Sequence, residues 1–85
     1  MRYEYQPQGV CSRHIAFELE DGVLHNVRFE GGCSGNTQGV ARLVEGMDAR
    51  EALNRLTGIR CGFKSTSCPD QLARAIQQAL SAEQP

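Results

Sequence analysis

Four cysteines are the residues of this sequence best suited to chemistry. The chain has 85 residues, and the cysteines stand at Cys11, Cys33, Cys61 and Cys68. Thiolate sulfur binds zinc tetrahedrally and also holds iron in mononuclear or clustered sites. The spacing contains no Cys-x-x-Cys pair, since 21 residues separate the first two cysteines and six separate the last two. A shared metal site therefore requires the fold to bring the four residues together.

Composition predicts a single small domain, residues 1–85, in a reducing compartment. The net charge of −1 gives no electrostatic footprint for a nucleic-acid partner. The N-terminus lacks the apolar stretch of a signal peptide, and no segment approaches the ~20 apolar residues of a membrane helix. We therefore expect a cytoplasmic protein without a membrane contact, in which disulfides are rare. Cysteines in such a protein can also be small buried apolar residues, but their polar, glycine-rich neighbours favour metal or redox chemistry.

A small domain of this kind needs more stability than its core supplies. A chain this short buries only about 60% of the surface that its unfolded state exposes. A structural zinc ion contributes apparent binding energies of ~10–16 kcal/mol in zinc-finger peptides. A bound metal would therefore also stabilise the fold.

Two segments of alternating polar and apolar residues predict a β-hairpin. Its core face would carry six apolar residues, Ile15, Phe17, Leu19, Val23, Val27 and Phe29. Asp21-Gly22 lies between the segments and is a turn signal. Because a strict two-residue turn would oppose residues of unlike parity, we expect a three-residue loop, residues 21–23, with a bulge.

The register of this hairpin decides how two of the cysteines lie. The three-residue loop sets two apolar pairs opposite each other, Phe17 with Val27 and Ile15 with Phe29. The same register, continued to the open end, places Cys11 opposite Cys33. Directly opposed residues have β-carbons about 4.5–5.5 Å apart, which suits two ligands of one metal ion.

Three helices are expected after the hairpin. Helical spacing of apolar residues marks the first, which Gly46 ends. Asp48 to Glu51 forms a capping box for the second, and Gly58 ends it. A loop then leads to Cys68-Pro69-Asp70, where a proline and an acid indicate the start of the last helix. The fold class is therefore α+β, with an antiparallel hairpin or small sheet packed against about three helices.

Cys33 and Cys68 both stand where these predicted helices begin. Unpaired N–H groups and the positive end of the helix dipole favour a thiolate at such a position. Arg13, Arg60 and Lys64 are near the cysteines in sequence and could offset the charge of several thiolates.

Three other features are weaker candidates. His14 and His25 are candidate ligands, but a solvated histidine or one at the edge of the core is the commoner case. The glycine-rich segment 31–39 could hold a phosphate at a helix N-terminus. It lacks the Lys-Ser/Thr of a P-loop and the spacing of a dinucleotide fingerprint, so its glycines more simply let the chain turn around Cys33.

Thr66-Ser67-Cys68-Pro69-Asp70 spells the motif that names the TSCPD domain family. The resemblance extends from Gly9 to Leu80 and is closest to the small, stand-alone, four-cysteine branch of that family. Relatives in the family form a C-terminal domain of adenosylcobalamin-dependent ribonucleotide reductases. The resemblance therefore implies a role related to ribonucleotide reduction, without an established mechanism.

The order of elements also resembles the iron–sulfur cluster assembly scaffolds, on three stretches: 29–33, Glu51-Ala52 and 68–73. In that family three cysteines and an aspartate bind zinc or a nascent cluster. The three cysteines of that family match Cys11, Cys33 and Cys68. Arg13 stands at the place of the aspartate, and Ser67 stands where a histidine would precede the last cysteine. Cys61 is additional. The resemblance implies a scaffold-like fold, and the extra thiolate would suit a more closed site.

Four functions follow as hypotheses. The first is a metal-binding module for zinc or an iron–sulfur cluster, held by the four cysteines, without catalysis of its own, because no reductase barrel fits in 85 residues. The others are an accessory module of ribonucleotide reductase, a thiol redox protein and a nucleotide-binding module. The expected partners are a ribonucleotide reductase or the iron–sulfur machinery, and an exposed edge strand would allow a homodimer.

Overall fold

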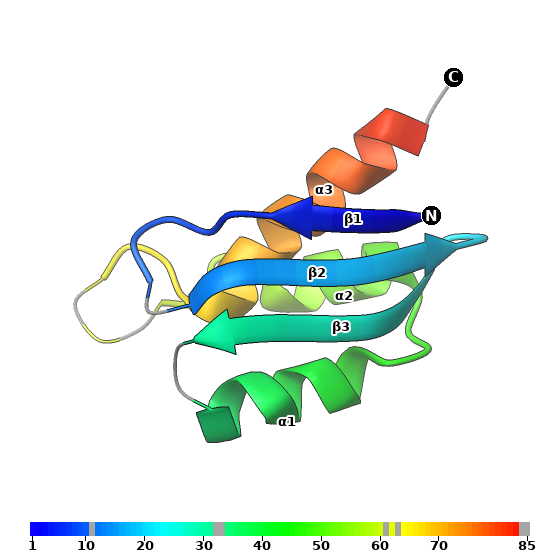
Figure 1. Ribbon diagram of the computed structural model, residues 1–85. Helices are drawn as coiled ribbons and strands as arrows, with labels where there is room; N and C mark the ends of the chain where they lie inside the picture. The colour runs from blue at the N-terminus through cyan, green and yellow to red at the C-terminus, as the bar shows by residue number, and fades with distance from the viewer. Residues whose placement is uncertain (11, 32–33, 61, 63, 84–85) are drawn as a thin grey trace.

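The structure, a computed structural model, describes residues 1–10, 12–31, 34–60, 62 and 64–83, with residues 34–36 described by their backbone alone. Its elements follow in the order β1 (Arg2–Tyr5), β2 (Ser12–Glu20), β3 (Val23–Gly31), α1 (Ser34–Val44), α2 (Ala49–Leu56) and α3 (Cys68–Glu83). The predicted α+β class, with a small antiparallel sheet and three helices, is confirmed (Figure 1).

The sheet is antiparallel with β2 at its centre, between β1 and β3. Helices α2 and α3 pack against each other behind the sheet, and α1 runs along β3 (Figure 1). The sequence patterns did not predict β1, which has only four residues. Its register with β2 sets Tyr3 opposite Phe17, and the two rings stack with centroids 5.8 Å apart. This stacking on a core residue compensates for the shortness of the strand.

The turn of the hairpin differs from the predicted three-residue loop. Glu20 pairs with Val23, so that the turn consists of Asp21 and Gly22 alone. Their φ angles are 51° and 78°, both in the left-handed region that a two-residue type I′ turn requires. The predicted loop over residues 21–23 is therefore wrong.

A bulge in β3 restores the register that the turn alone would have shifted. Ala16 pairs with Arg28 and Glu18 with His25, which leaves two residues of β3 facing one residue of β2. Asn26 lies in this bulge and has a φ of 54°. An extra residue in one strand reverses which face the following side chains occupy.

The bulge explains which parts of the register prediction hold. On its far side Ile15 pairs with Phe29, as predicted. The predicted pair of Phe17 with Val27 is replaced by the bulge itself. On the turn side Leu24, which the predicted alternation leaves off the core face, is fully buried.

A second shift occurs near the open end of the hairpin. His14 pairs with Glu30, but Ser12 pairs with Gly31, where the predicted register would pair it with residue 32. The predicted opposition of Cys11 and Cys33 lies outside the described residues. The register from which it was derived is wrong by one residue at the neighbouring pair.

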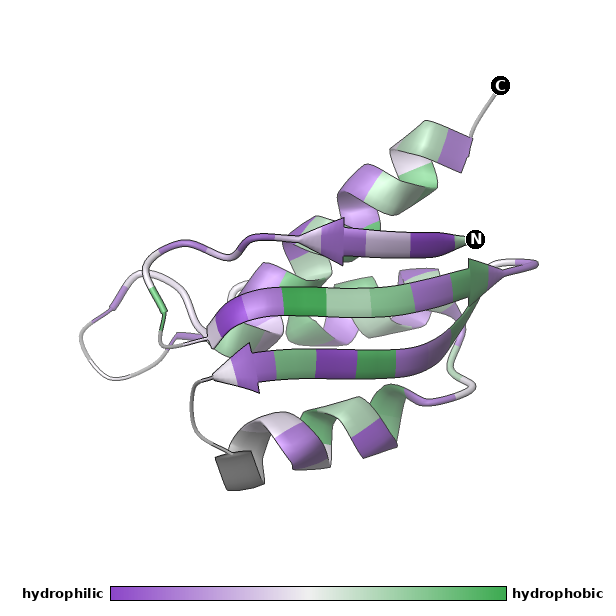
Figure 2. Ribbon diagram, in the orientation of Figure 1, coloured by the Kyte–Doolittle hydropathy of each residue, from purple (hydrophilic) through white to green (hydrophobic). Residues whose placement is uncertain are grey.

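The core lies between the sheet and the helices. Alternating hydrophilic and hydrophobic bands run along β3, as a strand with one buried face requires (Figure 2). The residues buried in this cluster are Ile15, Phe17, Leu19, Leu24, Val27, Val44, Ala49, Ala52, Leu72, Ala75, Ile76 and Ala79. Most of the helical residues in this cluster belong to α3. The packing of α3 on the sheet therefore holds its first turn in a fixed position.

Helix α2 begins as its capping box predicts. The Asp48 carboxylate accepts a hydrogen bond of 3.1 Å from the backbone N–H of Glu51. The segment before the helix runs beside the hairpin, since the N–H of Ala49 donates to the Gly22 carbonyl at 2.8 Å. Within the described part of the chain, no helix is long and apolar enough to cross a membrane.

Candidate functional site

Segments that neighbour the cysteines gather at one end of the molecule. The start of β2, the end of β3, the start of α3 and the loop between α2 and α3 all lie there (Figure 1). We call this region the cysteine end. Cys11, Cys33 and Cys61 lie outside the described residues, so Cys68 is the predicted ligand whose position is given. The geometry of the site is therefore built from Cys68 and from the residues that flank the other three.

Cys68 is the first residue of α3 and is partly buried with a free thiol. Its Sγ forms a hydrogen bond of 2.9 Å with the hydroxyl of Ser12, in which either group can donate. Ser12 is 2% exposed and directly follows Cys11 in the chain. The prediction that Cys68 begins a helix is confirmed, and this bond joins the start of α3 to the start of β2.

Ser67 is the N-cap of α3. Its hydroxyl oxygen accepts a hydrogen bond of 3.1 Å from the N–H of Asp70, which is the third residue of the helix. The same hydroxyl donates to the Ile59 carbonyl at 2.6 Å. One side chain thus caps the helix and ties it to the loop that follows α2.

Asp70 is a buried carboxylate with three donors around it. Oδ1 accepts from the Gly58 N–H at 2.7 Å, and Oδ2 accepts from the Thr66 hydroxyl and lies 3.3 Å from Arg74 Nε. Burial by itself raises the pKa of Asp70, but the hydrogen bonds from Thr66 and Gly58 and the charge of Arg74 outweigh it. The pKa of this carboxyl therefore lies below its ordinary value, and the carboxylate is ionised at neutral pH.

Gln71 extends the network toward the N-terminal loop. Its Nε2 donates to the Thr66 hydroxyl oxygen at 2.9 Å, while Oε1 accepts from the Gln8 N–H at 3.1 Å and from the Tyr5 hydroxyl at 3.4 Å. Gln71 is 2% exposed, and among the described residues no buried side-chain nitrogen or oxygen lacks a partner. A fully satisfied buried network fixes the relative positions of the segments that it joins.

The first turn of α3 therefore holds the chain on both sides of two cysteines. On either side of residue 11, Gln8 binds Gln71 and Ser12 binds Cys68. On either side of residue 61, Gly58 and Thr66 bind Asp70 in the first turn of α3, and Ile59 binds its N-cap, Ser67. Cys33 directly precedes the first residue of α1 in the chain. These hydrogen bonds hold the described segments that flank Cys11 and Cys61 against the first turn of α3, which begins with Cys68.

The two histidines are engaged with carboxylates in the structure. His14 Nε2 lies 2.8 Å from Glu4 Oε1, and His25 Nδ1 lies 3.0 Å from Glu45 Oε2. Across the described ranges, which include one of the four cysteines, no three side chains of the His, Cys, Asp or Glu type are grouped to hold a metal. The four-cysteine site stays a prediction. The zinc ion or iron–sulfur cluster that it would hold and the partner proteins stay predictions too.

Sequence reasoning missed two residues of this network, Ser12 and Gln71. Neither has a sequence signature, because each acts through a contact between segments more than 50 positions apart. Ser67, which the resemblance to the scaffolds placed at the position of a histidine, acts here as the cap of α3. The predicted start of α3 is confirmed, with Pro69 as its second residue.

Comparison with known proteins identifies one family. The model of the TSCPD domain matches residues 1–80 of the chain. No curated protein and no solved structure matches the chain. Residues 66–70, which spell the family name, are the same residues that cap α3 and form much of the buried network.

Proposed function

Because the chain belongs to the TSCPD domain family and its motif organises the cysteine end, we propose that it is a small metal-binding module. The proposed ligands are the thiolates of Cys11, Cys33, Cys61 and Cys68, and the proposed content is a zinc ion or an iron–sulfur cluster. The module has no catalytic activity of its own and holds its metal as a structural or transferable group.

One observation carries this proposal. The first turn of α3 binds the described residues on both sides of Cys11 and on both sides of Cys61, and Cys68 itself begins that turn. A network of this extent is more than a helix cap requires, since Ser67 alone caps the helix. Segments held in this way can present thiols to a common centre at little further entropic cost.

The donor chemistry fits a metal that prefers sulfur. The Cys68 thiol is free of any disulfide and stands at the N-terminus of a helix of 16 residues, where backbone N–H groups favour negative charge. The Ser12 hydroxyl can donate to a thiolate at this position, which is the role that outer hydrogen bonds play around metal-bound sulfur. Four thiolates without an open position suit a closed site rather than a catalytic one.

The test is the metal content of protein purified without oxygen. We expect about one equivalent of zinc, or iron with matching sulfide and a visible colour. Cys61→Ser and Cys68→Ser should each lower the metal content strongly. Ser81→Ala, an exposed change at the far end of α3, serves as the control and should leave it unchanged. Less than a tenth of an equivalent of any transition metal in the wild type would refute the proposal.

A thiol redox function is the second candidate, because Cys68 is a free thiol at a helix N-terminus. Counting thiols before and after mild oxidation separates the two functions. A redox protein loses two thiols reversibly and holds no metal. A metal module protects its thiols until a chelator removes the ion.

The family resemblance also leads us to propose a partner in ribonucleotide reduction or in iron–sulfur assembly. Co-purification from cells that contain both systems tests it, with the metal-free Cys61→Ser variant as the comparison. Recovery of neither system would refute this part of the proposal and leave the metal site to its own test.

A further inference from the structure

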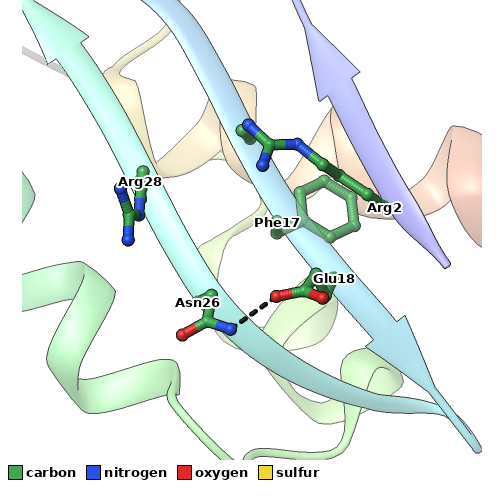
Figure 3. A pocket seen from close by; sticks show the side chains of 6 residues that line it. Arg2, Phe17, Glu18, Asn26 and Arg28 are labelled. Carbon is green, nitrogen blue, oxygen red and sulfur yellow. Dashed lines mark hydrogen bonds between the residues drawn. The ribbon is translucent and has the colours of Figure 1, made fainter.

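The face of the sheet that points away from the helices carries a small cavity. It has a volume of about 170 Å³ and is lined by Arg2 from β1, by Ala16 and Glu18 from β2, and by Asn26 and Arg28 from β3. Phe17 from β2 also borders it, although only 1% of the surface of Phe17 is exposed. Figure 3 shows Arg2 reaching from β1 across β2 and Arg28 on β3, with Glu18 and Asn26 beside each other below them.

Ala16 creates the cavity because it is small. It pairs with Glu4 on one side and with Arg28 on the other, so longer side chains surround it on the same face. Only 5% of its surface is exposed, although none of the helices that the structure describes covers this face of the sheet. The floor is therefore a methyl group shielded by the long side chains at the rim.

The acidic groups nearest the cavity already have partners. The Glu18 carboxylate accepts from the Asn26 amide, and the Glu4 carboxylate lies 2.8 Å from His14. In the described part of the chain, neither Arg2 nor Arg28 has a carboxylate oxygen within 4.0 Å of its guanidinium. Two arginines thus border one hollow, and no carboxylate of the described residues is paired with either of them.

We propose that this cavity binds a small oxyanion, a phosphate or carboxylate group, between the guanidinium groups of Arg2 and Arg28. Planar guanidinium groups recognise both kinds of oxyanion through paired, charge-assisted hydrogen bonds. The site is separate from the cysteine end and does not depend on the proposed metal.

The size and charge of the cavity limit what it can hold. Pockets for drug-sized ligands measure about 300–1,000 Å³, so a cavity of about 170 Å³ accommodates a charged end group and not a whole nucleotide. The Glu18 carboxylate repels an anion from its side of the rim. The oxyanion should therefore lie toward the arginines, and removal of the Glu18 charge should strengthen binding.

The test is a titration of the intact chain with sodium phosphate, followed by backbone amide signals at constant ionic strength. A parallel titration with sodium succinate separates phosphate from carboxylate as the preferred class. We expect saturable shifts at residues 16–18 and 26–28. Arg2→Gln and Arg28→Gln should each weaken binding about fivefold to tenfold, and Glu18→Gln should strengthen it about twofold.

Two further variants guard against a general effect of charge. Arg50→Gln removes an exposed arginine from α2 and should leave the affinity unchanged. Ala16→Leu fills the floor and should abolish the shifts, and its amide spectrum shows whether it folds. Shifts that do not saturate, or an equal loss with Arg50→Gln, would overturn the proposal. If Ala16→Leu does not fold, the two arginine variants decide alone.

Discussion

Asp70 should contribute more to stability than any exposed carboxylate of this domain. Replacing it with asparagine removes the charge and one of the two carboxylate oxygens that accept from Gly58 and Thr66. Hydrogen bonds to a buried charged group are worth about 1.5–3 kcal/mol each, so we expect Asp70→Asn to lower the free energy of unfolding by about 2 kcal/mol. For a domain of this size, that corresponds to a decrease in Tm of roughly 8–16 °C.

The matched control is Glu51→Gln, at the same capping position of α2. Glu51 is exposed and pairs with Arg55 at 2.7 Å along the helix. An exposed pair of this kind contributes little, so the change should stay within ~0.5 kcal/mol. Both variants are compared by urea unfolding in the same metal state as the wild type.

The pH dependence gives an independent check. The pKa of Asp70 lies below the value of about 3.9 that the unfolded chain would have. As pH falls past that value, protons bind first to the unfolded state, and the contribution of Asp70 disappears as pH falls through its folded pKa. The stability difference between wild type and Asp70→Asn should therefore be full near neutral pH and shrink below about pH 4. Equal stability of Asp70→Asn and Glu51→Gln, or a difference that does not change with pH, would refute the reasoning.

Two further predictions concern the hairpin. Leu24→Ala should lower the free energy of unfolding by about 2–5 kcal/mol because Leu24 is fully buried. Leu43→Ala, at a side chain that is 77% exposed, should change the free energy of unfolding little. Similar losses in the two variants would contradict the observed bulge. Glu45→Gln should speed amide exchange at Asn26, whose N–H donates to the Glu45 carboxylate at 2.7 Å. That bond and a second from His25 hold the pKa of Glu45 below its ordinary value. In the wild type the protection of the Asn26 amide should therefore be lost as pH falls through that lowered pKa. Unchanged amide exchange in Glu45→Gln would show that the bulge does not depend on Glu45.

Local signals in the sequence correctly predicted several elements. The Asp48–Glu51 box, the start of the last helix at Cys68 and the three helices all follow from interactions within one or two turns of chain. Such short-range preferences act before any tertiary contact and are readable from spacing alone. The α+β class follows from the same periodicities.

The details of the hairpin were not readable in the same way. The parity rule required one extra residue between Phe17 and Val27, and the sequence pattern predicted that residue in the turn. The structure places it at Asn26, where the Glu45 carboxylate from the end of α1 accepts from the backbone of the bulge. A contact between a strand and a later helix cannot be inferred from the pattern of either one.

The four cysteines were the feature that the sequence by itself could identify, because several thiols in a small domain indicate metal or redox chemistry by residue type alone. Their surroundings were decided by the tertiary structure. Ser12 and Gln71 carry no signal of their own, and they matter because folding brings β2 and the N-terminal loop to the first turn of α3. The paired arginines of the open sheet face have the same origin, because residues 2 and 28 become neighbours of Ala16 only when the three strands align. Residue type determines which chemistry is available, and the packing of distant segments determines where it can occur.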